Sequence, residues 1–342
     1  MKKSLIALAV MAASGAAMAQ SSVTLFGVVD QAVTYVNGGE NWNGINSGGN
    51  STSRIGFRGV EDLGGGLKAQ FWLEAGILAD EGSGRSGGAS GSGLEFKRRS
   101  TVSLLGNFGE VRLGRSTTAA YDAASRYDVF GTVGIGQAQH WGDVIRISNM
   151  LSYYSPDFSG FKFGVNYGFG EVAGDNRASR YVGGSLTYDN GPLSLGLGVD
   201  RLNRATALND DMDRWSLGGS YNFGVVKLAA AYTSVNFKPV TGEKDKNRGA
   251  YIGLSAPVGT AGEAKISYNR YENKFAGEKL KADQLAVGYV HNLSKRTAVY
   301  GTYAYIKNKN NNGDNLGLTL GNGTLKDNGS QHGLQVGLRH AF

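Results

Sequence analysis

The chain has 342 residues and no cysteine, so disulfide bonds cannot hold it together. Glycine is abundant, with 54 residues, and because each interior glycine costs a helix about 1 kcal/mol relative to alanine, the composition argues against a largely helical protein. The formal net charge is +7, but Lys and Arg are spread along the chain, which argues against a nucleic-acid-binding surface.

The N-terminal segment has the three parts of a secretory signal peptide. Lys2 and Lys3 form the charged start, residues 5–13 form the apolar run, and Ala17-Met18-Ala19 is a cleavage site of small residues. The run is too short for a membrane-spanning helix, which needs about 20 apolar residues. We expect residues 1–19 to be a signal peptide and residues 20–342 to form one domain that contains no spanning helix.

Most of the remaining chain alternates between apolar residues and small or polar ones. In residues 160–170, aromatic and aliphatic side chains occupy every second position, and the same period recurs in residues 192–201, 214–223, 264–268, 285–289 and 334–338. Strict alternation predicts β-strands with one apolar face and one polar or small face.

Short and long connections alternate between these strands. Seven short connections are expected at residues 62–67, 107–109, 155–160, 189–192, 222–225, 257–262 and 293–296. Glycines in several of them supply positive backbone angles, and all four prolines of the chain lie in connections. Seven short turns predict sixteen strands joined by eight longer loops, the even number expected of a closed single-chain barrel.

The alternation fits two architectures. In a soluble sandwich the apolar faces meet inside, whereas in a transmembrane barrel they face lipid and the polar faces line water. Aromatic residues such as Phe161, Phe169, Trp215 and Phe223 lie toward the ends of the apolar faces, which suits the two membrane interfaces. We therefore predict an all-β fold, a 16-stranded antiparallel transmembrane β-barrel, with the sandwich as the alternative.

The longer loops are expected at residues 37–52, 78–94, 117–145, 171–178, 203–212, 238–247, 275–280 and 310–329. Several are Gly/Ser/Asn tracts, typical of surface loops without chemistry of their own. Residues 117–145 are the longest departure from alternation before the last hundred residues, and a long loop in a compact fold is usually functional. Basic residues flank this loop and acids lie within it, so we expect acid on the loop to face base on the wall of a pore.

At this point the chain resembles the trimeric general porins of the Gram-negative outer membrane, most closely the beta-proteobacterial branch. Four segments are similar to family signatures, and they are residues 22–30, 53–67, 108–115 and 153–160. The final strand alternates up to Phe342, which resembles the signal read by the barrel assembly machinery. A last lipid-facing strand of another kind would also end in alternation.

The resemblance implies an outer-membrane channel for passive diffusion of small ions and polar solutes. It also implies a homotrimer in contact with membrane lipid and lipopolysaccharide. From the residues themselves we expect no cofactor, no metal and no nucleic-acid partner. The family's third loop folds into the lumen, where its carboxylates face basic residues on the wall.

Matched positions give the expected site residues. The resemblance places Arg54, Arg99 and Arg146 on the basic wall, and the alternation, with a cost of about 2–4 kcal/mol for a charge at lipid depth, places Arg58 and Arg112 in the lumen as well. Lys68 and Glu74 share the inward parity as weaker candidates. The expected loop acids are Asp122, Asp128 and Asp143, although the family's Pro-Glu-Phe-Gly string is Asp-Val-Phe-Gly at residues 128–131. Excess lumen arginine suggests a modest anion preference.

Other functions stay open at this point. An outer-membrane enzyme needs a fixed nucleophile and base, but the four histidines are His140, His291, His332 and His340, and neither Gly-x-Ser-x-Gly nor His-Glu-x-x-His occurs. A substrate-specific porin or an adhesin that uses the outer loops remains possible. Asp210, Asp211 and Asp213 fit an exposed acidic loop better than a metal site, for lack of fixed ligand spacing.

Overall fold

The computed structural model describes residues 22–86, 89–138, 144–203, 211–238, 245–275, 278–310, 317–324 and 329–342. The expected signal peptide, His140 and Asp143 lie outside these residues. Among the described residues, no helix is both long and apolar enough to cross a bilayer.

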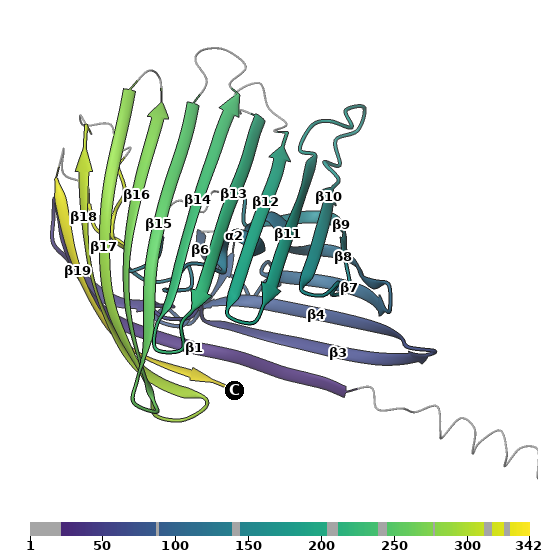
Figure 1. Cartoon of the computed structure of the whole chain (residues 1–342), viewed down its shortest axis with the longest axis horizontal. Coiled ribbons are helices and arrows are strands. Elements are labelled where there is room, and N and C mark those ends of the chain that lie inside the picture. The colour runs from purple at the N-terminus through teal and green to yellow at the C-terminus, as the bar shows by residue number, and fades with distance from the viewer. Residues whose placement is uncertain are drawn as a thin grey trace, which may run out of the picture.

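Sixteen long strands form a closed antiparallel barrel in the described part of the chain (Figure 1). They are β1 (Ser22–Asn37), β3 (Arg54–Gly64), β4 (Leu67–Leu78), β7 (Arg99–Gly106), β8 (Gly109–Thr117), β9 (Arg146–Tyr154), β10 (Phe161–Gly168), β11 (Tyr181–Asn190), β12 (Leu193–Leu202), β13 (Asp211–Asn222), β14 (Lys227–Lys238), β15 (Asp245–Val258), β16 (Gly262–Phe275), β17 (Glu278–Asn292), β18 (Thr297–Lys309) and β19 (Ser330–Ala341). The ring closes because β1 pairs with β3 on one side and with β19 on the other. The prediction of a 16-stranded antiparallel barrel is confirmed, and the sandwich is excluded.

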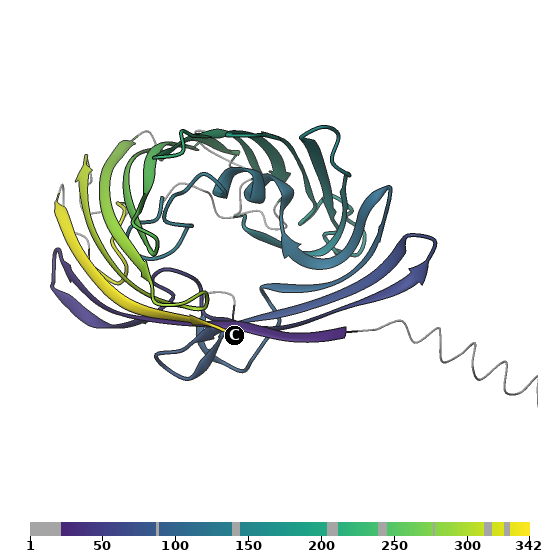
Figure 2. The ribbon, with the colours of Figure 1, turned by 60° about the horizontal axis from the view of Figure 1, so that its bottom comes forward.

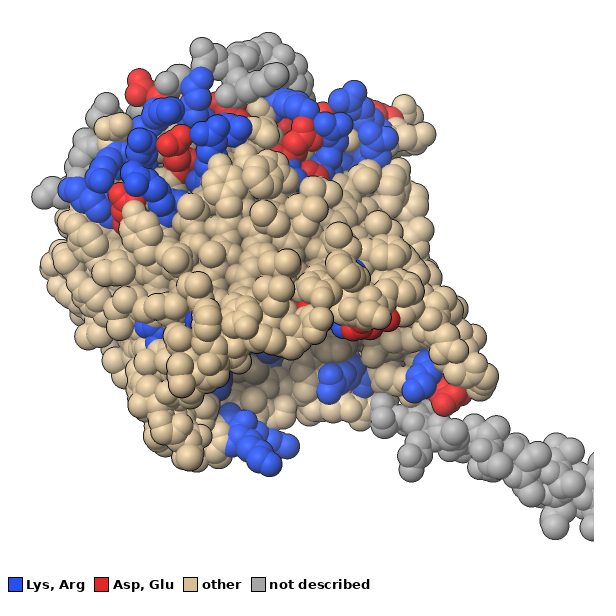
Figure 3. All heavy atoms as spheres, viewed as in Figure 1, with Lys and Arg blue, Asp and Glu red and all other residues tan. Residues whose placement is uncertain are grey.

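The two faces of the wall differ as the alternation predicted. On β12, Leu195, Leu197 and Val199 are exposed on the outside, whereas Gly196 and Asp200 on the other face are buried within the barrel. A broad band almost without charged side chains crosses the visible face of the barrel below its upper rim (Figure 3). This band is the surface that faces lipid.

The short connections lie where the sequence predicted them. The turn between β3 and β4 has positive φ at Gly65 and Gly66, and the turn between β11 and β12 has positive φ at Gly191. Glycine adopts such angles at little steric cost.

The long loops contain more structure than the sequence predicted. Three short strands lie in the first two, namely β2 (Trp42–Ser47), β5 (Ser83–Ser86) and β6 (Ala89–Ser92), so the Gly/Ser tract at residues 78–94 is partly paired. The third loop begins with the helix α2 (Ala119–Ser125), whose N-cap is Thr118. Two turns of helix are too short for the period of 3.6 to be visible in the sequence.

Candidate functional site

The helix α2 and residues 126–138 after it lie inside the ring of strands (Figure 2). The helix buries Ala119, Ala120, Ala123 and Ala124. Small residues on β12 and β13 make room for this contact. A Cβ atom at Gly198 would lie 2.6 Å from the Ala120 carbonyl oxygen, and one at Gly218 would collide with the Tyr127 ring.

Hydrogen bonds fasten the loop to the wall along its path. The Ala119 N–H donates to Asn166 Oδ1 at 2.6 Å, and the Val129 N–H donates to the Tyr251 hydroxyl at 2.7 Å. Farther along, Gln284 Nε2 donates to the Ile135 carbonyl at 3.0 Å. The loop therefore crosses the lumen from β10 to β17.

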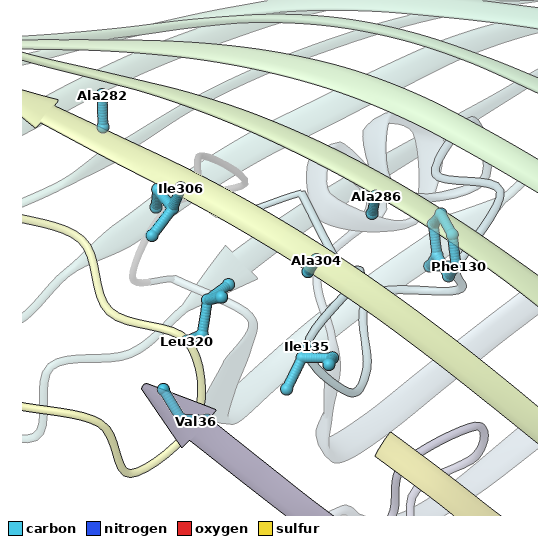
Figure 4. Packing of buried hydrophobic residues seen from close by; sticks show 8 residues of the cluster. All are labelled: Val36, Phe130, Ile135, Ala282, Ala286, Ala304, Ile306 and Leu320. Atoms are coloured by element: carbon cyan, nitrogen blue, oxygen red, sulfur yellow. The ribbon is translucent and has the colours of Figure 1, made fainter. Parts of the chain in front are cut away.

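An apolar cluster fixes the middle of the third loop to the wall near β17 and β18 (Figure 4). Phe130 and Ile135 from the loop pack against small and aliphatic residues of the wall and of the last long loop, which are Val36, Ala282, Ala286, Ala304, Ile306 and Leu320. Such a contact is stabilised by burial of apolar surface inside a water-filled barrel. The loop is thereby fixed in the lumen.

A buried ion pair of the wall holds the end of the third loop, at Val144. Arg214 and Asp200 face each other on β13 and β12, with side chains 3% and 0% exposed. Arg214 Nη2 also donates to the Val144 carbonyl at 3.3 Å. The pair thus fixes the chain just before β9 begins.

Asp128 organises the loop and does not face the lumen. Its carboxylate accepts hydrogen bonds from the backbone N–H groups of Phe130, Thr132 and Ala138 at 2.9, 3.0 and 2.9 Å, and the residue is 6% exposed. Burial raises the pKa of Asp128 above its ordinary value, although the three N–H groups act in the opposite direction. Its expected place opposite the wall arginines was wrong, because the carboxylate satisfies the loop's own backbone.

Of the two expected loop acids that the structure describes, Asp122 is the one that remains open to the lumen. It lies in the first turn of α2, and its carboxylate accepts a hydrogen bond from the Thr117 hydroxyl at 2.9 Å. The carboxyl reaches lumen water but is enclosed by the barrel, and this enclosure raises the pKa of Asp122 more than Thr117 and the nearby Arg112 and Arg146 lower it.

A cavity of about 800 Å³ lies between the loop and the opposite wall. The loop side consists of Tyr121, Ser125, Gln137 and residues 131–135, and the other side is basic. Six cationic side chains line the cavity, and they are Arg54, Arg85, Lys97, Arg98, Arg115 and Arg146. No Asp or Glu lines it among the residues that the structure describes. We call this space the cationic cavity.

Backbone carbonyls hold several of these side chains. Arg115 Nε donates to the Lys97 carbonyl at 2.7 Å and Arg146 Nε to the Arg98 carbonyl at 3.0 Å. Arg54 Nη1 donates to the Thr52 carbonyl at 3.1 Å. Since a guanidinium has five N–H donors, one such bond fixes its direction and leaves other donors for water or an ion.

Carboxylates behind the cavity balance part of this charge. Arg98 Nε lies 2.5 Å from Glu74 Oε1, and Arg54 Nε lies 3.9 Å from the same oxygen. Lys97 pairs with Glu95 at 2.7 Å. Two carboxylates set against six cations leave the cavity strongly positive.

The other expected arginines form a separate group, which we call the Glu110 cluster. Arg112 makes a bidentate pair with Glu110, at 2.8 and 2.9 Å. The guanidinium carbons of Arg99 and Arg58 lie 4.4 and 5.2 Å from the centre of the Trp72 ring. Of the five predicted arginines, Arg54 and Arg146 therefore line the cavity, whereas Arg58, Arg99 and Arg112 lie in the Glu110 cluster.

Sequence reasoning did not assign Arg85, Lys97, Arg98 and Arg115 to the site. Alternation settles parity only within regular strands, but Lys97 and Arg98 belong to an extended segment before β7 and Arg85 to the strand β5 in a loop. The crowding of basic residues just before the third loop was the available signal.

The C-terminal Phe342 seals the seam of the barrel. Its N–H and carbonyl both pair with Gly27 of β1 at 3.1 Å, which extends the β1–β19 pairing to the last residue. The ring lies on the outer, half-exposed side.

A closed barrel with a lipid-facing belt and a charged, constricted lumen defines a transmembrane β-barrel channel. The sequence profile described as "Gram-negative porin" matches residues 5–311. The chain belongs to the Gram-negative porin family. It is an outer-membrane porin, a water-filled channel for small hydrophilic solutes, and not an enzyme.

Individual relatives agree with this assignment. The chain is 49% identical to outer membrane porin protein 32 of Delftia acidovorans over the full length of both chains. It is 34% identical to an outer membrane porin protein of Bordetella pertussis, over 90% of this chain and 95% of that protein. Both relatives are named outer-membrane porins, which agrees with the family assignment.

Solved structures show the same fold. The "anion-selective porin from Comamonas acidovorans" superposes with a TM-score of 0.84 at 46% identity, over 94% of this chain and 100% of that one. OmpT of Vibrio cholerae in its "trimer form" has a TM-score of 0.71 at 15% identity, over 94% of this chain and 99% of that one. The latter likeness concerns the fold alone.

Proposed function

We propose that this porin conducts small anions and anionic polar solutes in preference to cations, and that the cationic cavity is its selectivity site. The observation that carries the proposal is the lining of six cationic side chains, without a carboxylate among the described lining residues. Charges of one sign in a narrow passage raise the local concentration of the opposite ion and repel ions of the same sign.

The mechanism needs no conformational cycle. An anion that leaves bulk water exchanges part of its hydration shell for the N–H groups of Arg54, Arg98 and Arg146. Because each guanidinium is already engaged by a carbonyl or by Glu74, the anion is attracted without being trapped, as conduction requires. The Glu110 cluster would then receive it with a weaker positive field, since Glu110 offsets Arg112.

Among the described loop acids, fewer face the lumen than the sequence predicted. Asp128 is turned into the loop, and among the described loop acids Asp122 alone is open to the lumen. The field proposed here therefore has mainly one sign, in place of opposed rows of acid and base. The 46% identical relative titled anion-selective supports the same sign of preference.

The assembly and its partners are part of the proposal. We infer a homotrimer in the outer membrane, with the short turns toward the periplasm and the long loops outside, in contact with membrane lipid and lipopolysaccharide. Residues 1–19 would act as the signal peptide, and the alternating strand that ends at Phe342 would be read by the barrel assembly machinery. The trimer form of a relative of the same fold supports the stoichiometry.

The test is the zero-current potential of the refolded protein in a planar bilayer across a KCl gradient. The expected result is a potential whose sign shows chloride to be more permeant than potassium, and a smaller one for Arg146→Ser. A potential of the opposite sign for the native chain would overturn the proposal.

A further inference from the structure

The segment between β2 and β3 makes a bulge into the lumen opposite β1. The pairing of β1 with β2 ends at Gln31 and Ser47, and its pairing with β3 begins at Val28 and Arg54. Six residues, 48–53, therefore stand opposite only two residues of β1. Extra length opposite a regular strand cannot stay in the ladder, and we call residues 48–53 the inward bulge. Three of its members line the cationic cavity, and they are Gly48, Ser51 and Thr52.

Asp30 of β1 holds the inward bulge through its carboxylate. The carboxylate accepts hydrogen bonds from the backbone N–H groups of Gly49, Asn50 and Ser51, at 3.2, 3.0 and 2.6 Å. The Tyr300 hydroxyl of β18 donates to the same carboxylate. Successive N–H groups in a turn form a concavity that binds an anion, and here the anion is the protein's own side chain. Asp30 is 0% exposed, so its charge is engaged by the backbone and is not in contact with lumen water.

The main chain of Asp30 is engaged by the inward bulge as well. Its N–H donates to Ser53 Oγ at 3.0 Å, and its carbonyl accepts from the Ser53 hydroxyl at 3.0 Å and from the Gly48 N–H at 2.8 Å. These bonds replace the ladder bonds that the bulge interrupts. From β19, Arg339 Nη1 donates to Asn50 Oδ1 at 2.7 Å. The inward bulge is therefore fastened to β1 at both of its ends and to β19 in its middle.

The inward bulge touches the third loop on its other side. A Cβ atom at Gly134 would collide with the Gly49 carbonyl oxygen, and Gly134 has a φ of 68°, an angle that favours glycine. The neighbouring Ile135 N–H donates to Gln335 Oε1 at 3.4 Å. The bulge and the third loop are thus in backbone contact, and together they bound one end of the cationic cavity.

The inward bulge also directs one of the arginines of the cavity. Arg54 Nη1 donates to the Thr52 carbonyl at 3.1 Å and to Ser51 Oγ at 3.4 Å. The Ser51 N–H is in turn held by the Asp30 carboxylate. Because both acceptors of Arg54 belong to the bulge, the direction of the guanidinium depends on the conformation that Asp30 imposes on residues 48–53.

We propose that Asp30 is a positioning residue of the selectivity site. From within the wall it holds the inward bulge, and the bulge directs Arg54 and closes the lumen against the third loop. The inference rests on the proposed function of the cationic cavity. It assigns to a buried acid the role of strengthening a preference for anions, since Asp30 acts through the geometry of the bulge and not through its own charge in the lumen.

Two simpler roles of Asp30 would give different results when its charge is removed. A carboxylate that contributes directly to the lumen field attracts cations, so its removal would increase anion preference. A carboxylate that only stabilises the fold would change the unfolding midpoint and leave the ion preference of the folded channel unchanged. The positioning role alone predicts that anion preference falls when a negative charge is removed.

The test measures the chloride-to-potassium permeability ratio, from the zero-current potential in a KCl gradient, for the refolded protein and four variants. Asp30→Asn removes the charge and one acceptor oxygen at nearly constant volume, and Tyr300→Phe removes one donor and keeps the charge. The matched controls are Asp283→Asn and Tyr303→Phe on the outer face of β17 and β18, where Asp283 accepts a hydrogen bond from the exposed Tyr268 and Tyr303 is itself exposed.

Asp30→Asn is expected to lower the ratio by about twofold or more and Tyr300→Phe to lower it by less, whereas both controls keep the native ratio. An unchanged or increased ratio in Asp30→Asn, or an equal fall in Asp283→Asn, would overturn the proposal. If Asp30→Asn does not fold, Tyr300→Phe decides, and an unchanged ratio there would overturn it. A native chain without anion preference would contradict the proposed function, whereas a native preference that the variants keep contradicts this inference alone.

Discussion

The two sides of the lumen are built from residues of opposite kinds. The side formed by β12–β14 presents Gly196, Gly198, Gly218, Ala229 and Ala231 to the interior. The side formed by β3, β4 and β7–β9 presents long charged and aromatic residues. The small residues leave space that the third loop fills, and the large ones line the water that remains.

The contrast between the two sides explains why the lumen is positively charged. The loop covers the side of small residues, where the inward charges Arg214 and Asp200 pair with each other, and it turns its buried acid Asp128 toward its own backbone. The arginine side keeps an excess of positive charge, because Arg115 and Arg146 are oriented by backbone carbonyls that do not neutralise them. Selectivity then depends on one wall, and the opposite wall sets the width.

The largest effect is expected from Asp128→Ala, which should destabilise the fold of the third loop. Three N–H groups, of which those of Phe130 and Ala138 are buried, would lose their acceptor, at a cost of about 1–3 kcal/mol for each buried group left unsatisfied. We expect a noisy current and rapid proteolysis within residues 117–145, with the thermal unfolding midpoint lowered. Asp122→Ala, in the same loop but exposed, is the control. Equal protease resistance in the two variants would contradict the role given to Asp128.

Gly218→Leu is expected to have the next largest effect, because it fills the space occupied by Tyr127. Overpacking of this kind costs about 1–3 kcal/mol, and the loop can avoid it by moving away from the wall. Single-channel conductance should then rise and anion preference fall. Gly219→Leu, on the lipid-facing side of the same strand, is the control. A conductance unchanged by Gly218→Leu would show that the loop does not set the width.

A moderate effect is expected on the arginine side from Trp72→Ala. Arg99 and Arg58 lie over this ring, and cation–π contacts contribute about 0.5–2 kcal/mol. Their loss should let both guanidiniums move and should weaken anion preference slightly. Phe71→Ala, which changes the outward neighbour on β4, should leave the zero-current potential unchanged. An equal change of the zero-current potential in both variants would show that Trp72 does not position the two arginines.

The smallest effect concerns pH. Since enclosure raises the pKa of Asp122, its carboxylate takes up a proton on acidification before an ordinary aspartate would. The charge lost is negative, so anion preference should increase as pH falls, and Asp122→Asn should show less of this increase. If the zero-current potential of the native chain showed a weaker anion preference at lower pH, the role given to Asp122 would be wrong.

Much of the fold could be predicted from the sequence because every second residue of a barrel strand meets lipid. That constraint fixed the strands, the short turns and the inward parity of Arg54, Arg58 and Arg112. It holds only within regular strands. Arg98 lies just before β7 and Arg85 in a loop hairpin, so alternation could not place them in the cavity.

The loop acids show the other limit of sequence reasoning. A carboxylate in a loop can face a solute or satisfy backbone N–H groups, and the sequence does not distinguish the two. Asp128 does the second, because residues 130, 132 and 138 fold back around it. Whether a loop carboxylate faces the lumen or the backbone depends on the path of the loop, which only the structure shows.

The central claim is that anion preference arises in the cationic cavity and not along the whole basic wall. The most direct test is the chloride-to-potassium permeability ratio of two triple variants. The first carries Arg54→Ser, Arg98→Ser and Arg146→Ser, and the second carries Arg58→Ser, Arg99→Ser and Arg112→Ser. We predict that the first loses most of the preference and that the second keeps most of it. An equal loss in both, or a larger loss in the second, would contradict the account.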